Sequence, residues 1–276
     1  VTAQAAAGNT IIVKPGTLPY REQVTIPVSG LPGSPFVLQA SGPGVVMNGA
    51  DDLSGTANWT LVSGNVWLAA SIATLTAPPT QVFLDGARMK DSVVTTPAVL
   101  PTGCFRYVSG TGLYVNIGGP NPGTRKIEYG KRQYAFRMDL KNYVTISGFE
   151  VYNYEQKGIY ASGPAHDDIF DSNKIFFSGK NGINAVACSS MVVRKNVVGH
   201  TADHGIYWLT CTNSVIEDNE SFDNWYPPLR RANGLNCENS SSRNLIQRNN
   251  WHHNQDTGEN FTTNSNFNIS LQNISH

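Results

Sequence analysis

Charged side chains are scarce in this chain of 276 residues: they make up 14% of it, and 20 basic and 20 acidic residues give a formal net charge of zero. No basic stripe stands out that could compete for nucleic-acid phosphates, so nucleic acid is excluded as a partner. The apolar runs are short and interrupted by Gly, Ser or Asn, so none is suited to span a bilayer. Few charges beside abundant Asn, Ser, Thr and Gly are typical of a secreted protein, and we expect an extracellular location.

An internal repeat is the strongest positive feature of the sequence. One column consists of glycines that each begin an extended run, spaced 24, 23, 29 and 24 residues apart: Gly158, Gly182, Gly205, Gly234 and Gly258. A second column consists of asparagines spaced 23, 23, 30 and 24 residues apart: Asn173, Asn196, Asn219, Asn249 and Asn273. The two columns keep phase, and both lengthen in the same repeat, so the pattern is not accidental.

The two columns predict coils of short strands. Between them lie apolar pairs such as Val192-Val193, Val215-Ile216 and Leu245-Ile246, which indicate strands with one or two inward side chains. Gly tolerates the tight bend that begins a strand, and stacked Asn amides can bond one another and the backbone at a bend. Leucine-rich repeats have a similar period, but their Leu pattern is missing. We predict an all-β fold, a right-handed parallel β-helix with coils about 4.8 Å apart.

The repeat does not cover the whole chain. We predict the first β-helix coil or coils in residues 1–50, an antiparallel β insertion flanking the solenoid in residues 51–132, and regular coils in residues 133–276. The sequence ends at His276 without an amphipathic helix or a polar cap, which would leave strand edges and apolar interior uncovered there. Either the natural chain continues, or self-association through this open coil covers it.

Several segments resemble a known family. The opening "GNTIIVKPGTLPYREQVTI", the segments "QVFLDGARM" and "GTGLYVNIGG", and the coil text "NYVTISGFEV" with "GIY" are similar to secreted bacterial right-handed parallel β-helix repeat proteins. That family includes pectate and alginate lyases, uronan epimerases, glycosidases and proteins with no known activity. The resemblance implies the solenoid fold and a polysaccharide as substrate.

A narrower resemblance concerns calcium. The segment "RANGLNCENSSSRNLIQRNNWHHNQDTGEN" is similar to the calcium-binding coils of one pectate-lyase family. Asp256 matches an acidic position of that family, whereas Asn233 replaces the first Asp, and Thr257 and Asn260 replace two further acids. The resemblance implies Ca²⁺ at Asp256 and Asn233, with fewer carboxylates than such a site normally has.

The strand that follows each Gly offers a face on which a polymer can lie. If Ile159, Ile183 and Ile206 point inward, alternation turns their neighbours outward onto one surface. With the residues just before each Gly, that surface gathers Lys157, Tyr160, Asn184, His204, Tyr207, Asn236 and Glu238. Three strand spacings span about 14 Å, the length of two or three sugar rings. We expect the Tyr and Asn side chains of this face to bind substrate.

The long coil carries its extra residues in the segment 224–232, beside the same face. Trp225 and Tyr226 can stack on sugar rings, and Arg230 and Arg231 can bind a uronate carboxylate through paired hydrogen bonds. A solenoid gains nothing structural from such an insertion, which favours a functional role.

These residues support a polysaccharide lyase as the first hypothesis. β-Elimination from a uronate needs a group that neutralises the carboxylate, a base for the C5 proton and a proton donor for the leaving oxygen. Arg231, His204 and Tyr207 are our candidates for these roles, with Lys157 as the alternative base. The alternative for His204 is an ordinary turn position.

A glycoside hydrolase is the second hypothesis, because it needs two carboxylates about 5–9.5 Å apart. Glu238 is one candidate, with Asp203 or Asp256 from a neighbouring turn as its partner. The segment His166-Asp167-Asp168 lies in a turn, and we interpret it as turn chemistry unless its carboxylates are strongly perturbed. A non-catalytic glycan-binding module and a structural subunit are further alternatives.

Two further sets of residues fall in phase with the repeat. Cys188 and Cys211 both lie six residues after a Gly, so they should be adjacent, either as a disulfide or as stacked free thiols. His200, Asp223 and His253 each follow a ladder Asn by four residues and could together bind Zn²⁺, although solvated turns also favour these residue types.

Overall fold

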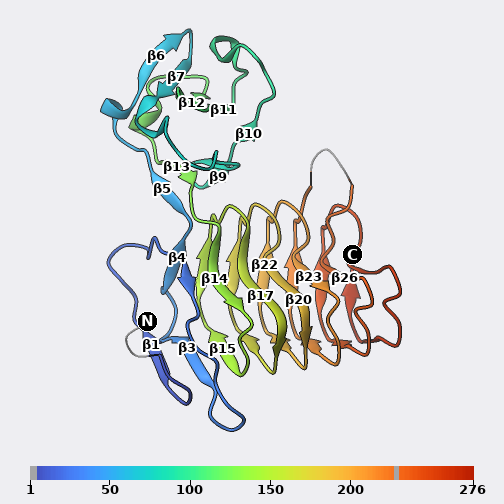
Figure 1. Cartoon of the computed structure of the whole chain (residues 1–276). Helices are drawn as coiled ribbons and strands as arrows, with labels where there is room; N and C mark the ends of the chain where they lie inside the picture. The colour runs from blue at the N-terminus through green and yellow to red at the C-terminus, as the bar shows by residue number, and fades with distance from the viewer. Residues whose placement is uncertain (1–4, 227–229) are drawn as a thin grey trace. The chain divides into compact units, whose positions relative to one another are not determined.

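The computed structural model describes residues 5–226 and 230–276, and the chain forms two compact units (Figure 1). One unit combines the chain up to Gly49 with the chain from Arg132 onward, and the other is the intervening segment Ala50–Lys131. Among the described residues, no helix has both the length and the apolar character that crossing a membrane requires.

The first unit is a parallel β-helix in which each coil contributes strands to three sheets (Figure 1). Sheet 1 contains β2 (Val24–Thr25), β14 (Tyr134–Asp139), β17 (Lys157–His166), β20 (Ile183–Ser189), β23 (Ile206–Leu209), β26 (Leu235–Glu238) and β29 (Glu259–Phe261). Sheet 2 contains β1 (Thr10–Val13), β3 (Phe36–Ala40), β15 (Val144–Ser147), β18 (Ile169–Asp171), β21 (Val192–Arg194), β24 (Val215–Glu217), β27 (Leu245–Gln247) and β30 (Ile269–Leu271). Sheet 3 contains β4 (Val46–Asn48), β16 (Glu150–Tyr152), β19 (Lys174–Phe176), β22 (Val197–Gly199), β25 (Glu220–Phe222), β28 (Asn250–His252) and β31 (Ile274–Ser275). Neighbouring strands in all three sheets run parallel, so the predicted fold class is confirmed.

The register places residues about two dozen positions apart side by side. Ile159 pairs with Ile183, and Ile183 pairs with Ile206. All three side chains are fully buried. They belong to a core that runs along the solenoid and also includes Phe136, Trp208, Leu235, Ile246 and Trp251. The inward direction predicted for this column is therefore confirmed, and its neighbours on the strands face outward.

The Gly column is required by the closeness of successive coils. Gly182 donates its N–H to the carbonyl of Gly205 at 3.0 Å. A Cβ atom on Gly182 would lie 2.2 Å from Cγ1 of Val198 and 2.9 Å from the Gly205 oxygen, so a larger residue would push the coils apart.

The predicted Asn ladder is present at the bend between sheets 2 and 3. Oδ1 of Asn196 accepts from the backbone N–H of Asn173 at 3.0 Å, and Nδ2 of Asn196 donates to Oδ1 of Asn219 at 3.0 Å. The same contacts continue through Asn249 and Asn273. Asn196 is fully buried, so its amide takes the place of water for the bent backbone.

A second polar column stands where each coil enters sheet 2. Ser214 and Asn244 each accept a backbone N–H of the preceding coil through a side-chain oxygen. Asp168 holds the same position in an earlier coil: Oδ1 accepts from the N–H of Val144 at 2.8 Å, and the buried Oδ2 has no hydrogen-bond partner in residues 5–226 and 230–276. Burial raises the pKa of Asp168 to about 8. The carboxyl is thus strongly perturbed, and the cause is its place in this column.

The second unit, Ala50–Lys131, contains the antiparallel β structure predicted near the N-terminus. One sheet contains β10 (Lys90–Asp91), β11 (Cys104–Val108), β12 (Gly112–Asn116), β7 (Val66–Ala69) and β6 (Thr60–Ser63), of which only β10 and β11 pair in parallel. The other contains β5 (Ala50–Asp52), β13 (Ile127–Gly130), β8 (Val82–Leu84) and β9 (Ala87–Arg88). Four short 3₁₀ turns join them: η2 (Thr56–Asn58), η3 (Ala70–Ile72), η4 (Pro97–Val99) and η5 (Pro122–Thr124). A core around Phe105 and Leu113 holds the unit together.

The structure describes the two cysteines predicted to be adjacent and the three residues proposed to bind zinc. Cys188 and Cys211 are free thiols, and the backbone N–H of Cys188 lies 3.3 Å from Sγ of Cys211. Nδ1 of His200 lies 3.9 Å from Oδ2 of Asp223, whereas His253 contacts its neighbour in sequence. Within residues 5–226 and 230–276, no three His, Cys, Asp or Glu side chains are grouped to hold a metal ion.

The last coil exposes several large apolar side chains. Phe267, Ile269 and Ile274 are each more than half exposed. Self-association through this coil stays a prediction.

We expect Asn196→Ala to lower the free energy of unfolding by about 3 kcal/mol, because buried groups of the coils on both sides lose their partner. Urea unfolding measures this change. Asn266→Ala, at an exposed Asn outside the ladder, should change stability little, and an equal effect of both variants would contradict the role of the ladder.

We also expect Asp168 to make stability depend on pH. Its folded pKa of about 8 lies above the ordinary value of 3.8, so between these values the folded state holds a proton that the unfolded chain has released. The contribution of this proton to the free energy of unfolding is fully present below pH 3.8 and is lost as the pH rises through 8. Asp168→Asn should therefore be more stable than the wild type at pH 8 and show a flatter dependence in thermal unfolding. Asp223→Asn, at an exposed carboxylate that does not act on Asp168, should keep the wild-type slope.

Candidate functional site

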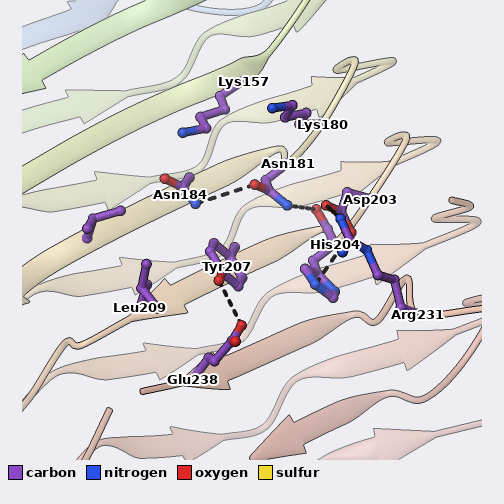
Figure 2. A pocket seen from close by; sticks show the side chains of 11 residues that line it. Lys157, Lys180, Asn181, Asn184, Asp203, His204, Tyr207, Leu209, Arg231 and Glu238 are labelled. Carbon is purple, nitrogen blue, oxygen red and sulfur yellow. Dashed lines mark hydrogen bonds and ion pairs between the residues drawn. The ribbon is translucent and has the colours of Figure 1, made fainter. Parts of the chain in front are cut away.

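One cavity opens on the outer face of sheet 1 (Figure 2). Its volume is about 350 Å³. It is lined by Lys157, Lys180, Asn181, Asn184, Val186, Asp203, His204, Tyr207, Leu209, Arg231 and Glu238. These residues come from four successive coils, and most of them are polar or charged.

The strand register explains why these side chains converge. Asn184, Tyr207 and Asn236 pair in adjacent strands and form one outward row. Leu209 pairs with Glu238 in a second outward row, two residues further along the strands. The cavity therefore lies over β20, β23 and β26, with the residues before the Gly column along one edge.

The structure brings together most of the residues predicted for the site. All five candidate catalytic residues line the cavity: His204, Tyr207, Arg231, Lys157 and Glu238. Of the candidate binding residues, Asn184 lines it as well. Asn236 contacts Glu238, and Tyr160 lies beneath Lys157.

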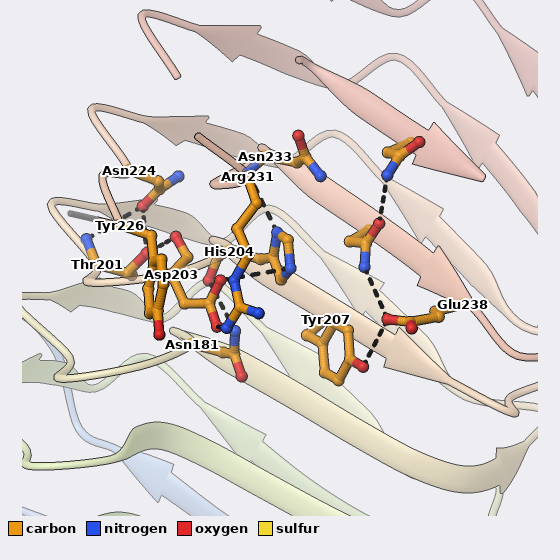
Figure 3. Close-up of polar contacts among 12 residues, drawn as sticks. Asn181, Thr201, Asp203, His204, Tyr207, Asn224, Tyr226, Arg231, Asn233 and Glu238 are labelled. Carbon is orange, nitrogen blue, oxygen red and sulfur yellow. Dashed lines mark hydrogen bonds and ion pairs between the residues drawn. The ribbon is translucent and has the colours of Figure 1, made fainter. Parts of the chain in front are cut away.

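Glu238 is held by two donors from neighbouring residues of sheet 1 (Figure 3). The hydroxyl of Tyr207 donates to Oε2 at 2.7 Å, and Nδ2 of Asn236 donates to the same oxygen at 3.3 Å. Nδ2 of Asn260 in turn donates to Oδ1 of Asn236 at 2.9 Å, which orients that amide. Burial and the Glu238 carboxylate raise the pKa of Tyr207, so its phenol stays protonated and serves as a donor.

Asp203 lies on the other side of the cavity and pairs with Arg231. Nη2 of Arg231 donates to Oδ2 of Asp203 at 3.0 Å. Oδ1 of Asp203 is buried and has no hydrogen-bond partner within the part of the chain that the structure describes. The ring of Tyr226 lies against the guanidinium, with Cζ of Arg231 4.1 Å from the ring centroid. Arg231 is thus already engaged by a carboxylate and an aromatic ring of its own chain.

His204 lies between these two carboxylates (Figure 3). Its ring stacks on that of Tyr207, with centroids 5.3 Å apart, and its Nε2 lies 3.4 Å from Oδ1 of Asp203. The backbone N–H of Asn233 donates to Nδ1 at 3.2 Å, so the proton of the neutral ring belongs on Nε2. Burial lowers the pKa of His204 against the opposing effect of Asp203, which keeps the ring neutral. The lone pair that a base would use is therefore occupied.

Lys157 and Lys180 lie at the opposite end of the cavity from Glu238 (Figure 2). Nζ of Lys157 is 3.9 Å from the ring centroid of Tyr160, which itself stacks on Tyr134. Burial lowers the pKa of Lys157 to about 8, and the nearby charge of Lys180 acts in the same direction. This end of the cavity is cationic.

Asn181 and Asn184 lie between the two ends of the cavity. Nδ2 of Asn184 donates to Oδ1 of Asn181 at 3.4 Å, and Nδ2 of Asn181 lies 3.5 Å from the His204 carbonyl. Oδ1 of Asn184 is buried and has no hydrogen-bond partner among the described residues. An acceptor in this state is available to a hydroxyl of a ligand.

Sequence reasoning did not place Lys180 at the site, and it assigned Asn181 no role. Asn181 directly precedes Gly182, as Lys157 and His204 precede their own Gly, and Lys180 stands one residue earlier, so the phase of the repeat could have identified both. Sequence reasoning named Asp203 only as one of two possible partners of Glu238, and the structure puts it, not Asp256, in the cavity.

The predicted rim loop contributes less than expected to the cavity. Trp225 is 58% exposed, and Nε of Arg230 lies 3.4 Å from Oδ1 of Asp256. Neither Trp225 nor Arg230 lines the cavity. Residues 227–229 of this segment lie outside the described residues.

The residues proposed for calcium already have protein partners. Oδ1 of Asn233 accepts from the backbone N–H and the hydroxyl of Thr257, at 3.1 and 2.8 Å. Asp256 is paired with Arg230. One paired carboxylate and one bonded amide do not form the oxygen-rich set that Ca²⁺ requires. No step of the proposed chemistry therefore involves Ca²⁺, and calcium binding at Asp256 and Asn233 stays a prediction.

Comparison with known proteins agrees with this architecture. The family described as "Right handed beta helix region" matches residues 134–276, so the chain belongs to the right-handed β-helix proteins. The structure described as "The complex structure of XylC with xylose" is 16% identical, with a TM-score of 0.70 over 98% of this chain and 59% of that chain. A structure described as "Glycoside hydrolase" is 8% identical, with a TM-score of 0.53 over 96% of this chain and 89% of that one. No curated protein matches the sequence.

At this identity the two structures show the fold alone. The chain spans about three-fifths of the length of the XylC structure.

We expect His204 to be neutral at pH 7, with its proton on Nε2. Asp203→Asn should lower the pKa of His204, because the carboxylate raises it, and Arg231→Gln should raise that pKa, because the guanidinium lowers it. Nitrogen-detected NMR titration, with His204→Gln for assignment, measures both. Shifts in the same direction in the two variants, or a proton on Nδ1, would contradict this description.

Proposed function

We propose that this protein is a glycoside hydrolase whose reaction centre is the cavity between Asp203 and Glu238. The observation that carries the proposal is the pair of carboxylates that line one cavity on opposite sides of the His204–Tyr207 ring stack. Hydrolysis of a glycosidic bond needs two such groups, one to protonate the leaving oxygen and one to attack or to activate water.

Glu238 is assigned the role of the ionised carboxylate. Two donors, the hydroxyl of Tyr207 and the amide of Asn236, bond to its Oε2 and stabilise negative charge there. Oε1 is left to face the substrate, either as a nucleophile at the anomeric carbon or as a base for the attacking water.

Asp203 is assigned the role of the proton donor. Its Oδ1 is buried, has no hydrogen-bond partner among the described residues and lies 3.4 Å from Nε2 of His204, and we assign to this oxygen the proton that passes to the glycosidic oxygen. Arg231, bonded to Oδ2, balances the negative charge left on Asp203 after the proton has moved. Water then completes the cleavage by adding its hydroxyl to the anomeric carbon. Its proton goes to Glu238 when Glu238 acts as the base, and to Asp203 when Glu238 acts as the nucleophile.

The similar structures support a carbohydrate as the substrate. One of them was solved with xylose and another is described as a glycoside hydrolase, and both share most of this chain's fold. The composition, poor in charge and rich in polar amides and hydroxyls, supports secretion, where such a substrate is available.

A polysaccharide lyase is the second candidate, and Lys157 favours it. With a pKa of about 8, this lysine is partly deprotonated near neutral pH and can remove a C5 proton. His204 is less suited to this role because its Nδ1 is bonded to Asn233 and its Nε2 carries the proton. Arg231, the predicted carboxylate binder, is paired with Asp203.

We expect Glu238→Gln and Asp203→Asn each to lower kcat by about 10²–10⁴-fold, the range for loss of a positioned acid or base. A panel of aryl glycosides and neutral and acidic polysaccharides, assayed for reducing ends, measures this. Glu220→Gln, at a carboxylate of sheet 3 away from the cavity, is the matched control and should retain activity. Products with unsaturated-uronate absorbance, formed at equal rates by Glu238→Gln and the wild type, would establish the lyase instead.

A further inference from the structure

Two lysines of the cavity have no carboxylate partner. Lys157 and Lys180 both line it, and within residues 5–226 and 230–276 neither ammonium lies within ion-pairing distance of an acidic group. Like charges placed together oppose each other, and a fold gains no stability from such a pair. The arrangement is explained if the counter-charge arrives with a ligand.

The acidic group that acts on Lys157 and the two carboxylates that line the cavity are engaged elsewhere. The charge of Asp139 acts to raise the pKa of Lys157. Its carboxylate, however, accepts hydrogen bonds from Nε of Arg137 and from the hydroxyl of Ser162, each at 2.6 Å. Asp203 is bonded to Arg231, and Glu238 is bonded to Tyr207. The cationic end of the cavity is therefore not neutralised by the protein.

Lys157 is also held in a fixed position. Its ammonium lies over the ring of Tyr160 at 3.9 Å, and Tyr160 is backed by the ring of Tyr134 at a centroid distance of 5.4 Å. An ammonium group held on an aromatic ring already has a fixed position, so the lysine side chain loses less conformational entropy when it binds an anion.

An independent observation beside the lysines points to a ligand with hydroxyl groups. Asn184 is 1% exposed, lines the cavity, and has a buried Oδ1 without a hydrogen-bond partner. An amide oxygen accepts from a hydroxyl and does not bind a carboxylate. The ligand must therefore offer both an anion and a neutral donor.

We propose that Lys157, Lys180 and Asn184 form a subsite for a uronate residue, in which the lysines bind the sugar carboxylate and Asn184 accepts from a hydroxyl. The subsite deepens the proposed function, because it names an acidic glycan as the substrate class. β17 and β26 are three strand spacings apart, about 14 Å, so the uronate occupies a sugar position away from Glu238. The inference rests on the cavity being a glycan site and not on how the bond is cleaved.

Binding alone tests this subsite. Titration calorimetry at low salt with D-glucuronate and D-galacturonate should show binding at least ten-fold tighter than that of glucose and galactose. The double variant Lys157→Gln with Lys180→Gln should lose this preference, whereas Lys174→Gln, an exposed lysine of sheet 3, should retain it. Asn184→Ala should weaken uronate binding but leave the wild-type response to acetate. Circular dichroism and thermal unfolding verify that each variant is folded.

Protonation of Lys157 gives a second readout. Lys180, Arg137 and Asp139 are the charged groups that act on it, and Tyr134 and Tyr160 pack against it. Uronate affinity should fall as the pH rises through about 8, because the ammonium loses its proton there. The double variant should lack this dependence.

Several results would overturn the subsite: equal binding of uronates and neutral sugars, equal binding of acetate and glucuronate, no uronate binding, or unchanged uronate binding in the double variant. These outcomes are distinct from failure of the proposed function. Hydrolysis abolished by Glu238→Gln without any uronate preference removes the subsite alone. Lysine-dependent uronate binding by a protein that cleaves no glycan removes the hydrolase alone.

Discussion

Parallel backbone pairing between successive coils is the constraint on which the rest of this structure depends. It fixes the coil spacing at about 4.8 Å and determines which residue of one coil pairs with which residue of the next, so side chains far apart in sequence become neighbours. The Gly column permits that spacing, as the contacts around Gly182 show. The Asn ladder satisfies the backbone at the bends without charge.

The same register organises the cavity. Arg231, Asp203 and His204 form one end of a connected row that continues through Tyr207 to Glu238. Asp203 is paired with Arg231, and Glu238 accepts hydrogen bonds from Tyr207 and Asn236, so both carboxylates have partners in the protein before any ligand arrives. The two lysines at the other end have no such partners among the described residues, and this difference separates the proposed reaction centre from the proposed binding subsite.

The regular part of the fold was predictable from sequence because a two-column repeat encodes the register directly. The phase of Gly and Asn was enough to place Tyr207 beside Asn236 and Leu209 beside Glu238, and hence to assemble most of the cavity. The antiparallel insertion was predictable as a break in the period. The exact register of its strands was beyond sequence reasoning, because no repeat sets a register there.

The pairing of side chains within the site was not predictable. Whether Arg231 binds a substrate or Asp203 depends on the path of the long coil, which departs from the repeat. The state of His204 depends on one backbone N–H from the next coil, that of Asn233, and no residue pattern reveals it. Asp168 differs from its polar neighbours only in its charge, and the pKa that results follows from complete burial.

A crystal structure of Glu238→Gln with a bound acidic oligosaccharide tests the central claim most directly. We predict sugar rings along the outer face of β20, β23 and β26, with a glycosidic oxygen between Asp203 and residue 238. An oligosaccharide bound on sheet 2 or sheet 3, with the cavity empty, would contradict this prediction.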